Sequence, residues 1–164
     1  MSLNKTQTGF TLLEIMVAIV VLSLGLLGLA GLQAASLRNN QTAYYRGIAT
    51  QQAYDIADRL RANLAGVRAG NYSNLAQGLP GGNPNCFTAA CSAANMAISD
   101  HRQWNTANAA LLPNGNGTVV CVDGPAAAGC TAATGNWVFN ITVSWTERTE
   151  AGSGTQSFVT SITP

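Results

Sequence analysis

The chain has 164 residues, of which 9% are charged, and a formal net charge of +1. This length allows one domain of ordinary size beside any membrane segment. Because the net charge is close to zero, no basic surface is available to neutralise phosphates, and specific nucleic-acid binding is not expected.

The first nine residues form a short polar segment, in which Lys5 is the only charged side chain. They lack the apolar middle and small-residue exit of an ordinary secretory signal. An apolar segment then runs to Leu37 with Glu14 as its only charge. From Ile15 to Leu32, eighteen residues, the only polar side chain is Ser23, so the segment can cross a bilayer as one helix. Read from the residues alone, it is an uncleaved single-pass anchor whose flanking charges do not decide its orientation.

Two features of the apolar segment need an explanation. A carboxylate at the edge of a membrane span is costly unless it finds a partner, so Glu14 is a candidate functional residue. Gly25, Gly28 and Gly31 recur at every third position. They either form a helix-packing face, because small residues let backbones approach, or weaken the helix so that it can stretch, because glycine has poor helix propensity.

The helical pattern continues beyond the apolar segment and predicts one helix from Thr11 to about Leu64. Its outer half is expected to carry a globular domain on one face, formed by Tyr45, Ile48, Gln52, Ile56, Leu60 and Leu64. Turn signals between Gly66 and Asn85 predict a connecting loop.

A second helix is expected from about Ala93 to Leu112, capped by Ser92 and ended by Pro113. On one side of this helix we expect Ala97, His101, Trp104, Asn108 and Leu111. Asn114-Gly115 and Asn116-Gly117 then indicate a tight turn.

Strand patterns dominate the end of the chain, at residues 118–122, 137–146 and 156–162, with a turn from Glu150 to Gly154 between the last two. Trp137, Phe139, Ile141 and Val143 alternate with polar residues and form the expected buried face. Short connections predict an antiparallel meander packed on the long helix, which is an α+β fold.

The four cysteines, Cys86, Cys91, Cys121 and Cys130, all follow the apolar segment. An even number in an exported region indicates disulfides, and the spacing lacks the close second pair of a four-cysteine zinc site. Of three possible connectivities we expect Cys86 with Cys91 and Cys121 with Cys130, because each closes a short loop. No metal or cofactor is expected.

A catalytic role is not expected. Asp100 and His101 are adjacent in sequence, but neighbours on a helix do not face each other, and no serine or cysteine is placed for activation by them. We therefore expect a solvated or partly buried histidine in a protein that is not an enzyme.

The beginning of the chain resembles the class III leader of type IV prepilins. The resemblance rests on the segment from Gly9 to Glu14, its short polar leader and the apolar run that follows. It implies that a prepilin peptidase cuts after Gly9 on the cytoplasmic side and methylates the amine of Phe10. It also implies a pilin fold made of a cleaved leader (1–9), a transmembrane or fibre-core helix (10–37) and an exported globular domain (38–164), whose first part (38–64) continues the helix.

Further segments resemble PilV-type minor pilins, also called type IV pilus modification proteins. They are Gly25 to Gln33, Ala57 to Asn63, Asp100 with Trp104, Leu112 to Gly115 and Val143 to Trp145, and the membrane helix lacks the proline usual in major pilins. The resemblance implies a subunit that primes assembly from the inner membrane, with its globular domain periplasmic, and that later lies in the pilus at the cell surface. Implied effects are on adhesion and twitching motility. Implied partners are other minor and major pilins, prepilin peptidase and the inner-membrane assembly machinery.

Cleavage after Gly9 makes Phe10 the first residue and places Glu14 one helical turn away. The positive amine of one subunit can then pair with Glu14 of another in an apolar fibre core, where either charge alone costs several kcal/mol. The alternative is that Glu14 lies in the lipid headgroup layer.

Two other functions stay open on the sequence. A pseudopilin of a type II secretion system shares the leader and the long helix with a minor pilin. A tip-exposed ligand- or DNA-binding module is the alternative from another class.

Overall fold

The computed structural model describes residues 9–122, 137–149 and 152–164 of the chain. The chain divides into two compact units, Met1–Gln41 and Thr42–Pro164. The predicted long helix is confirmed as α1 (Leu12–Ala62). Its first part belongs to the first unit, and its later part belongs to the second.

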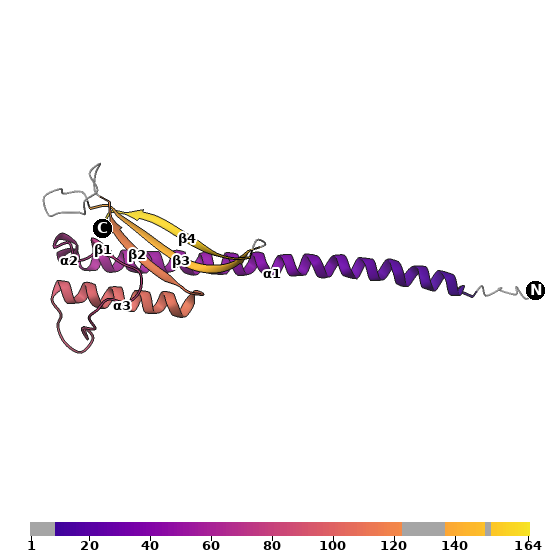
Figure 1. Ribbon diagram of the computed structural model, residues 1–164, viewed down its shortest axis with the longest axis horizontal. Coiled ribbons are helices and arrows are strands. Elements are labelled where there is room, and N and C mark those ends of the chain that lie inside the picture. The colour runs from indigo at the N-terminus through magenta and orange to yellow at the C-terminus, as the bar shows by residue number, and fades with distance from the viewer. Residues whose placement is uncertain (1–8, 123–136, 150–151) are drawn as a thin grey trace, which may run out of the picture. The chain divides into compact units, whose positions relative to one another are not determined.

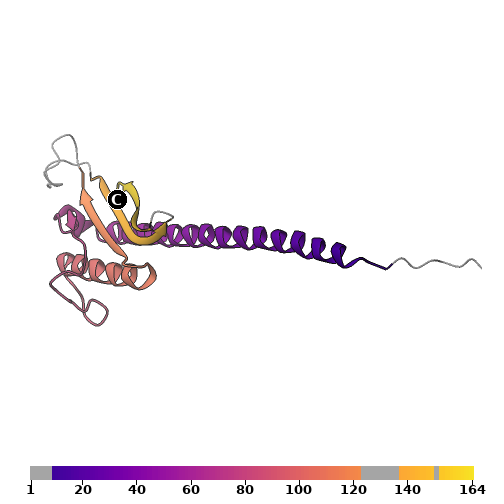
Figure 2. The same cartoon turned by 45° about the vertical axis from the view of Figure 1, so that its right-hand side comes forward.

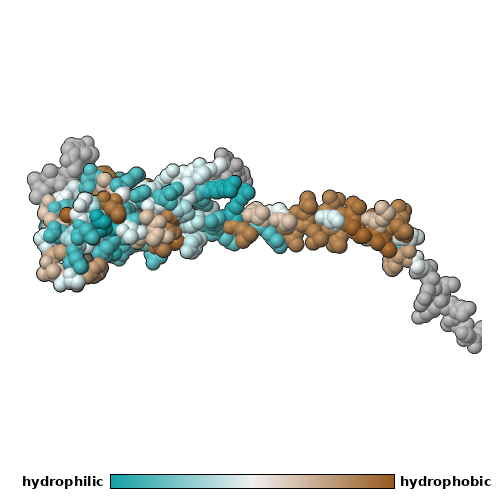
Figure 3. All heavy atoms as spheres, turned by 60° about the horizontal axis from the view of Figure 1, so that its bottom comes forward, coloured by the Kyte–Doolittle hydropathy of each residue, from teal (hydrophilic) through white to brown (hydrophobic). Residues whose placement is uncertain are grey.

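In the first unit, the side chains of α1 are exposed and, up to Leu37, mostly apolar. Leu13, Val21 and Leu27 are each more than half exposed, and the visible face of this part of the helix is almost wholly apolar in Figure 3. Among the described residues, α1 is the only helix long and apolar enough to cross a membrane, judged by length and composition.

The second unit combines three helices with an antiparallel sheet. Besides the end of α1, it contains α2 (Leu64–Arg68) and α3 (Ala93–Leu111). The strands follow the order β1-β2-β3-β4, each antiparallel to its neighbour, and are β1 (Asn74–Leu75), β2 (Asn116–Cys121), β3 (Phe139–Thr149) and β4 (Gly152–Ile162). Figures 1 and 2 show α3 alongside the later part of α1, with the sheet crossing this part of α1. The predicted α+β pilin-like fold is confirmed.

The core of the second unit lies between α1, α3 and the sheet. Ile56 and Leu60 of α1 are fully buried, and each contributes about 1.5–3 kcal/mol of hydrophobic free energy. Alternate residues of β3 meet them, because successive strand side chains point to opposite faces: Phe139, Ile141, Val143 and Trp145 are buried. The Trp104 indole Nε1 of α3 donates a hydrogen bond to the backbone oxygen of Gln52, 2.8 Å away. This bond joins the two helices inside the core.

The connection from α3 to β2 depends on two glycines. A Cβ at Gly117 would lie 2.3 Å from the ring of Trp104, and one at Gly115 would lie 2.0 Å from the backbone oxygen of Asn108. Asn114 before them adopts a positive φ of 51°, which asparagine tolerates better than most residues. The chain can therefore turn tightly against the end of α3.

Several predicted boundaries and faces were wrong. The segment expected to be one loop between Gly66 and Asn85 contains most of α2 and also β1, which is too short to show alternation. Leu64, expected on the face of the long helix that carries the globular domain, is 42% exposed, and Leu111 is 47% exposed. Leu112 is buried instead, because α3 ends at Leu111 and the extended backbone of Leu112 turns its side chain inward.

The strands also extend further than the patterns indicated. Asn116 and Gly117, expected in a turn, already pair with Ser144 and Val143. The turn expected from Glu150 to Gly154 is shorter, because Gly152 and Gly154 belong to β4 and pair with Thr149 and Glu147. Glycine is uncommon in strands, so the sequence favoured a turn at these positions.

Candidate functional site

The start of α1 is held by its own residues. Gly9, Phe10 and Thr11 precede the helix, and the Thr11 hydroxyl oxygen accepts a hydrogen bond from the backbone N–H of Glu14 at 3.3 Å. The backbone oxygen of Thr11 accepts from the N–H groups of Glu14 and Ile15. Thr11 is therefore an N-cap that satisfies donors otherwise unpaired at a helix start.

Glu14 lies in the first turn of α1, where its negative charge meets the positive end of the helix dipole. It shares one side of the helix with Phe10, since both line a shallow groove with Ile15, Ala18, Ile19 and Leu22. Phe10 is 80% exposed. The structure thus places the two residues predicted for processing and charge pairing at one end of an apolar helix face.

The three glycines at Gly25, Gly28 and Gly31 lie inside α1, which continues through them without a break. A Cβ built at any of them has no neighbouring atom within 4 Å among the described residues. Nothing within this part of the chain therefore requires glycine there, and both interpretations of the triplet stay predictions.

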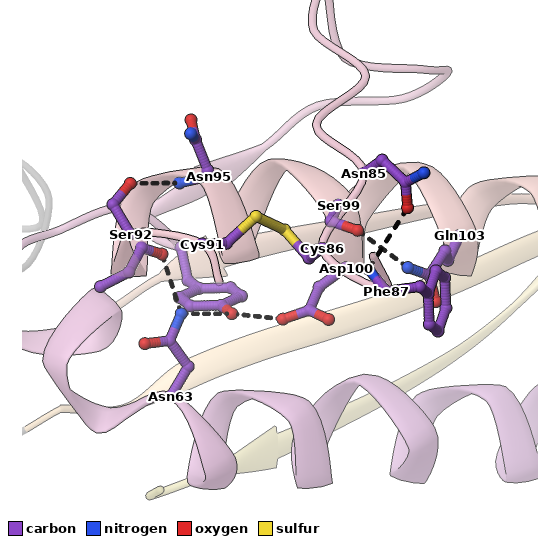
Figure 4. The surroundings of a disulfide bond; sticks show 12 residues. Asn63, Asn85, Cys86, Phe87, Cys91, Ser92, Asn95, Ser99, Asp100 and Gln103 are labelled. Atoms are coloured by element: carbon purple, nitrogen blue, oxygen red, sulfur yellow. Dashed lines mark hydrogen bonds between the residues drawn. A yellow bond between two sulfur atoms is a disulfide. The ribbon is translucent and has the colours of Figure 1, made fainter. Parts of the chain in front are cut away.

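The Cys86–Cys91 disulfide predicted from the sequence is present. It closes a short loop directly before α3, as Figure 4 shows, and Ser92 caps α3 by accepting from the N–H of Asn95 at 3.2 Å. The second expected disulfide, Cys121–Cys130, stays a prediction, because Cys130 lies outside the described residues.

A polar network joins α1, α3 and the segment after α2. Asp100 accepts a hydrogen bond from the Tyr72 hydroxyl at 2.5 Å and from Arg59 Nη1 at 3.2 Å, and Arg59 Nε binds Asp55 at 2.9 Å. Burial, followed by the hydrogen bond to Asp100, raises the pKa of Tyr72 far above its usual value. Burial alone would lower the pKa of Arg59, but the bonds and charges of Asp55 and Asp100 raise it instead. Asp100 therefore has a structural role, because its hydrogen bonds connect α3 to Tyr72 and to Arg59 of α1.

His101 is more buried than expected, with 7% of its surface exposed. Its Nε2 donates to the backbone oxygen of Ala76 at 2.9 Å, since a carbonyl can only accept. Burial lowers the pKa of His101, and the bond to Ala76 offsets this only in part. In the described part of the chain, no group of three or more His, Cys, Asp or Glu residues could hold a metal ion.

Sequence reasoning missed the Thr11 cap and the Asp100 network for different reasons. Thr-x-x-Glu before an apolar run is the known pattern of a helix N-terminus and was available in Thr11 and Glu14. The pairing of Arg59 with Asp100 joins residues 41 positions apart and leaves no local pattern.

A family model described as the prokaryotic N-terminal methylation motif matches residues 4–30. The match covers the cap, Phe10, Glu14 and the first two glycines of the triplet. Neither the curated proteins nor the solved structures give a significant match to this chain.

Proposed function

We propose that this chain, whose methylation motif indicates a type IV pilin-like or pseudopilin-like protein, is a PilV-type minor pilin that joins or primes a bacterial type IV pilus. The observation that carries the proposal is the match of the motif to residues 4–30. The pilin-like fold supports it, because a single helix supplies both the apolar segment and the spine of the globular unit.

The motif marks a substrate of prepilin peptidase, and we assign the cut to the bond after Gly9. Phe10 then becomes the methylated N-terminal residue. Residues 10–37 hold the subunit in the inner membrane with its N-terminus cytoplasmic, and residues 38–164 form the periplasmic domain. This assignment is supported by the apolar exposed side chains of the first unit, which suit lipid or neighbouring helices better than water.

Glu14 has a role in assembly under this proposal. The amine of one subunit's Phe10 pairs with Glu14 of its neighbour, and the pair fixes the stagger between helices because an unpaired charge in an apolar core is costly. Phe10 and Glu14 lie along the same groove of α1, which supports a partner that approaches from one side.

Mass spectrometry of the protein from cells with active prepilin peptidase tests the processing. We expect a mature chain that begins with N-methylated Phe10. A chain that retains Met1 in those cells, while their other pilins are processed, would contradict the proposal.

Deletion of the gene in the host bacterium separates a minor pilin from a pseudopilin. Loss of surface pili that is restored by the intact copy supports the pilus role. Normal piliation with secreted enzymes retained in the periplasm would instead assign the chain to type II secretion. The two outcomes are read in the same strain by counting pili and by assaying culture supernatant.

A further inference from the structure

The loop before α3 and the adjoining side of that helix enclose a hollow of about 170 Å³. Its lining includes three residues with amide side chains, Asn83, Asn85 and Gln103, together with Arg102 and Phe87. Figure 4 shows Asn85, Phe87 and Gln103 together at one end of the disulfide-closed loop. The hollow thus combines several planar polar groups with one aromatic ring.

Phe87 is an unusual surface residue, since 83% of its side chain is exposed. It directly follows Cys86, whose disulfide with Cys91 closes the loop. Its backbone N–H donates to the side-chain oxygen of Asn85 at 3.3 Å, so a hydrogen bond also restrains the loop backbone there. These bonds restrain the backbone around Phe87, and the exposed residue adds little to the core.

The walls of the hollow are fixed in the same way. Arg102 Nε donates to the backbone oxygen of Gly82 at 2.9 Å, and its Nη2 donates to that of Pro80 at 2.8 Å. Gln103 donates to the Ser99 hydroxyl at 2.8 Å and accepts from Arg59 at 3.1 Å. Because Arg102 and Gln103 are already held by these hydrogen bonds, their ordering on ligand binding costs little conformational entropy.

Hydrogen-bonding capacity remains unused at the mouth of the hollow. Within the described part of the chain, the Asn83 side chain and Asn85 Nδ2 have no protein partner. Amides donate and accept at fixed angles, and Arg102 has further N–H groups beyond its two backbone bonds. Among the described residues that line the hollow, none carries a carboxylate, so these residues do not suit a metal cation or a basic ligand.

We propose that this hollow binds one pyranose ring of a glycan, with Phe87 against the apolar C–H face of the sugar and the amides on its hydroxyls. A sugar ring has both kinds of surface, and a volume of about 170 Å³ is below the range of roughly 300–1,000 Å³ typical of pockets for drug-sized ligands. Binding by the hollow does not depend on the proposed role in a pilus.

The test uses the full chain in a detergent without a sugar headgroup. Saturation-transfer NMR with the methyl glycosides of glucose, galactose, mannose and N-acetylglucosamine, and with N-acetylneuraminic acid, measures binding up to about 20 mM, since single sugars bind weakly. We expect at least one sugar to bind. Phe87→Ala and Asn83→Ala should each weaken it by about tenfold or more, and Phe87→Trp should retain it.

Val159→Ala is the matched control, because Val159 is also an exposed apolar residue but belongs to β4. Unchanged binding in that variant, with loss in the two loop variants, supports the site. No binding by any sugar of the panel overturns the proposal, and so does binding that survives both loop variants. Failure of the chain to enter pili would contradict the proposed function but not the sugar site.

Discussion

Thr11 and Glu14 occupy the same helix start but are expected to act at different places. The Thr11 hydroxyl bonds the N–H of Glu14 within one chain, whereas the Glu14 carboxylate is proposed to meet a second chain. Substituting each residue separates the two effects, because only one of the two bonds crosses a subunit boundary.

We expect Glu14→Gln to be cut normally but to enter pili poorly, since an amide keeps the shape and removes the charge. Thr11→Ala should lose about 1 kcal/mol of helix stability and still enter pili. Immunoblots of sheared pili and of membranes measure both fractions. Equal incorporation of Glu14→Gln and the unchanged protein would leave the charge pair without support.

His101 gives the second unit a dependence on pH. Its pKa in the folded state is lowered from 6.5, so the unfolded chain binds a proton more readily. Above about pH 6.5, His101 is neutral in both states and does not lower the free energy of unfolding. Below that pH, the unfolded chain takes up the proton more readily, so the free energy of unfolding falls.

The chain has one histidine, which makes this dependence assignable. We expect the unfolding temperature of the full chain in detergent to fall between pH 7 and pH 5.5, and this slope to shrink in His101→Gln. Circular dichroism of both proteins at matched ionic strength measures it. An identical slope in the variant would show that other groups cause the effect.

At the scale of elements, the contact between α3 and β2 depends on the missing side chain of Gly117. Trp104 fills the space that a Cβ would need. In contrast, Gly47 lies on an exposed side of α1, and a Cβ there meets nothing within 4 Å. The same substitution should therefore have opposite effects at the two positions.

We expect Gly117→Ala to destabilise the second unit by about 1–3 kcal/mol through overpacking against Trp104. Gly47→Ala should stabilise it by about 0.5–1 kcal/mol, because alanine favours a helix over glycine. Chemical denaturation of the full chain in the same detergent measures both. A stable Gly117→Ala protein would mean that Trp104 can move aside at little cost.

Elements in which a hydrophobic pattern repeats over many residues were predictable from the sequence. Elements that depend on pairing with distant residues were not. Alternation in β3 and helical spacing in α1 gave the correct elements and buried faces at Phe139, Ile141, Ile56 and Leu60. β1 has only two residues, which is too few to show an alternating pattern, and it is a strand because it pairs with β2. The Asp100 network and the hollow at Phe87 likewise depend on segments that only the tertiary fold brings together.

At the scale of the whole molecule, charge is nearly balanced while apolar surface is concentrated in the first unit. The net charge is +1, and the side chains of α1 up to Leu32 are exposed. Association with a membrane should therefore depend on hydrophobic burial and hardly on lipid charge.

We expect the full chain to float with zwitterionic and anionic liposomes to the same extent, at low and at high salt. Flotation in a density gradient measures the bound fraction. A Leu22→Arg, Leu26→Arg variant is the control and should bind less, since charged side chains are costly at the centre of a span. Release by salt would indicate a peripheral, electrostatic attachment instead.

The hydrogen bonds at the start of α1 have one more consequence. Among the residues that the structure describes, all of them come from Thr11 and the residues after it, so the proposed cut after Gly9 would break none of these bonds. The proposed cut would therefore change the charge of the subunit and keep the described hydrogen bonds at its helix start. It would create a new cation beside the positive end of the helix dipole, which repels it, and the proposed pairing with Glu14 of a neighbour would add to the compensation that the subunit's own Glu14 gives. The proposed removal of the leader would thus leave the subunit with a positive charge that favours association with the Glu14 of a neighbouring subunit.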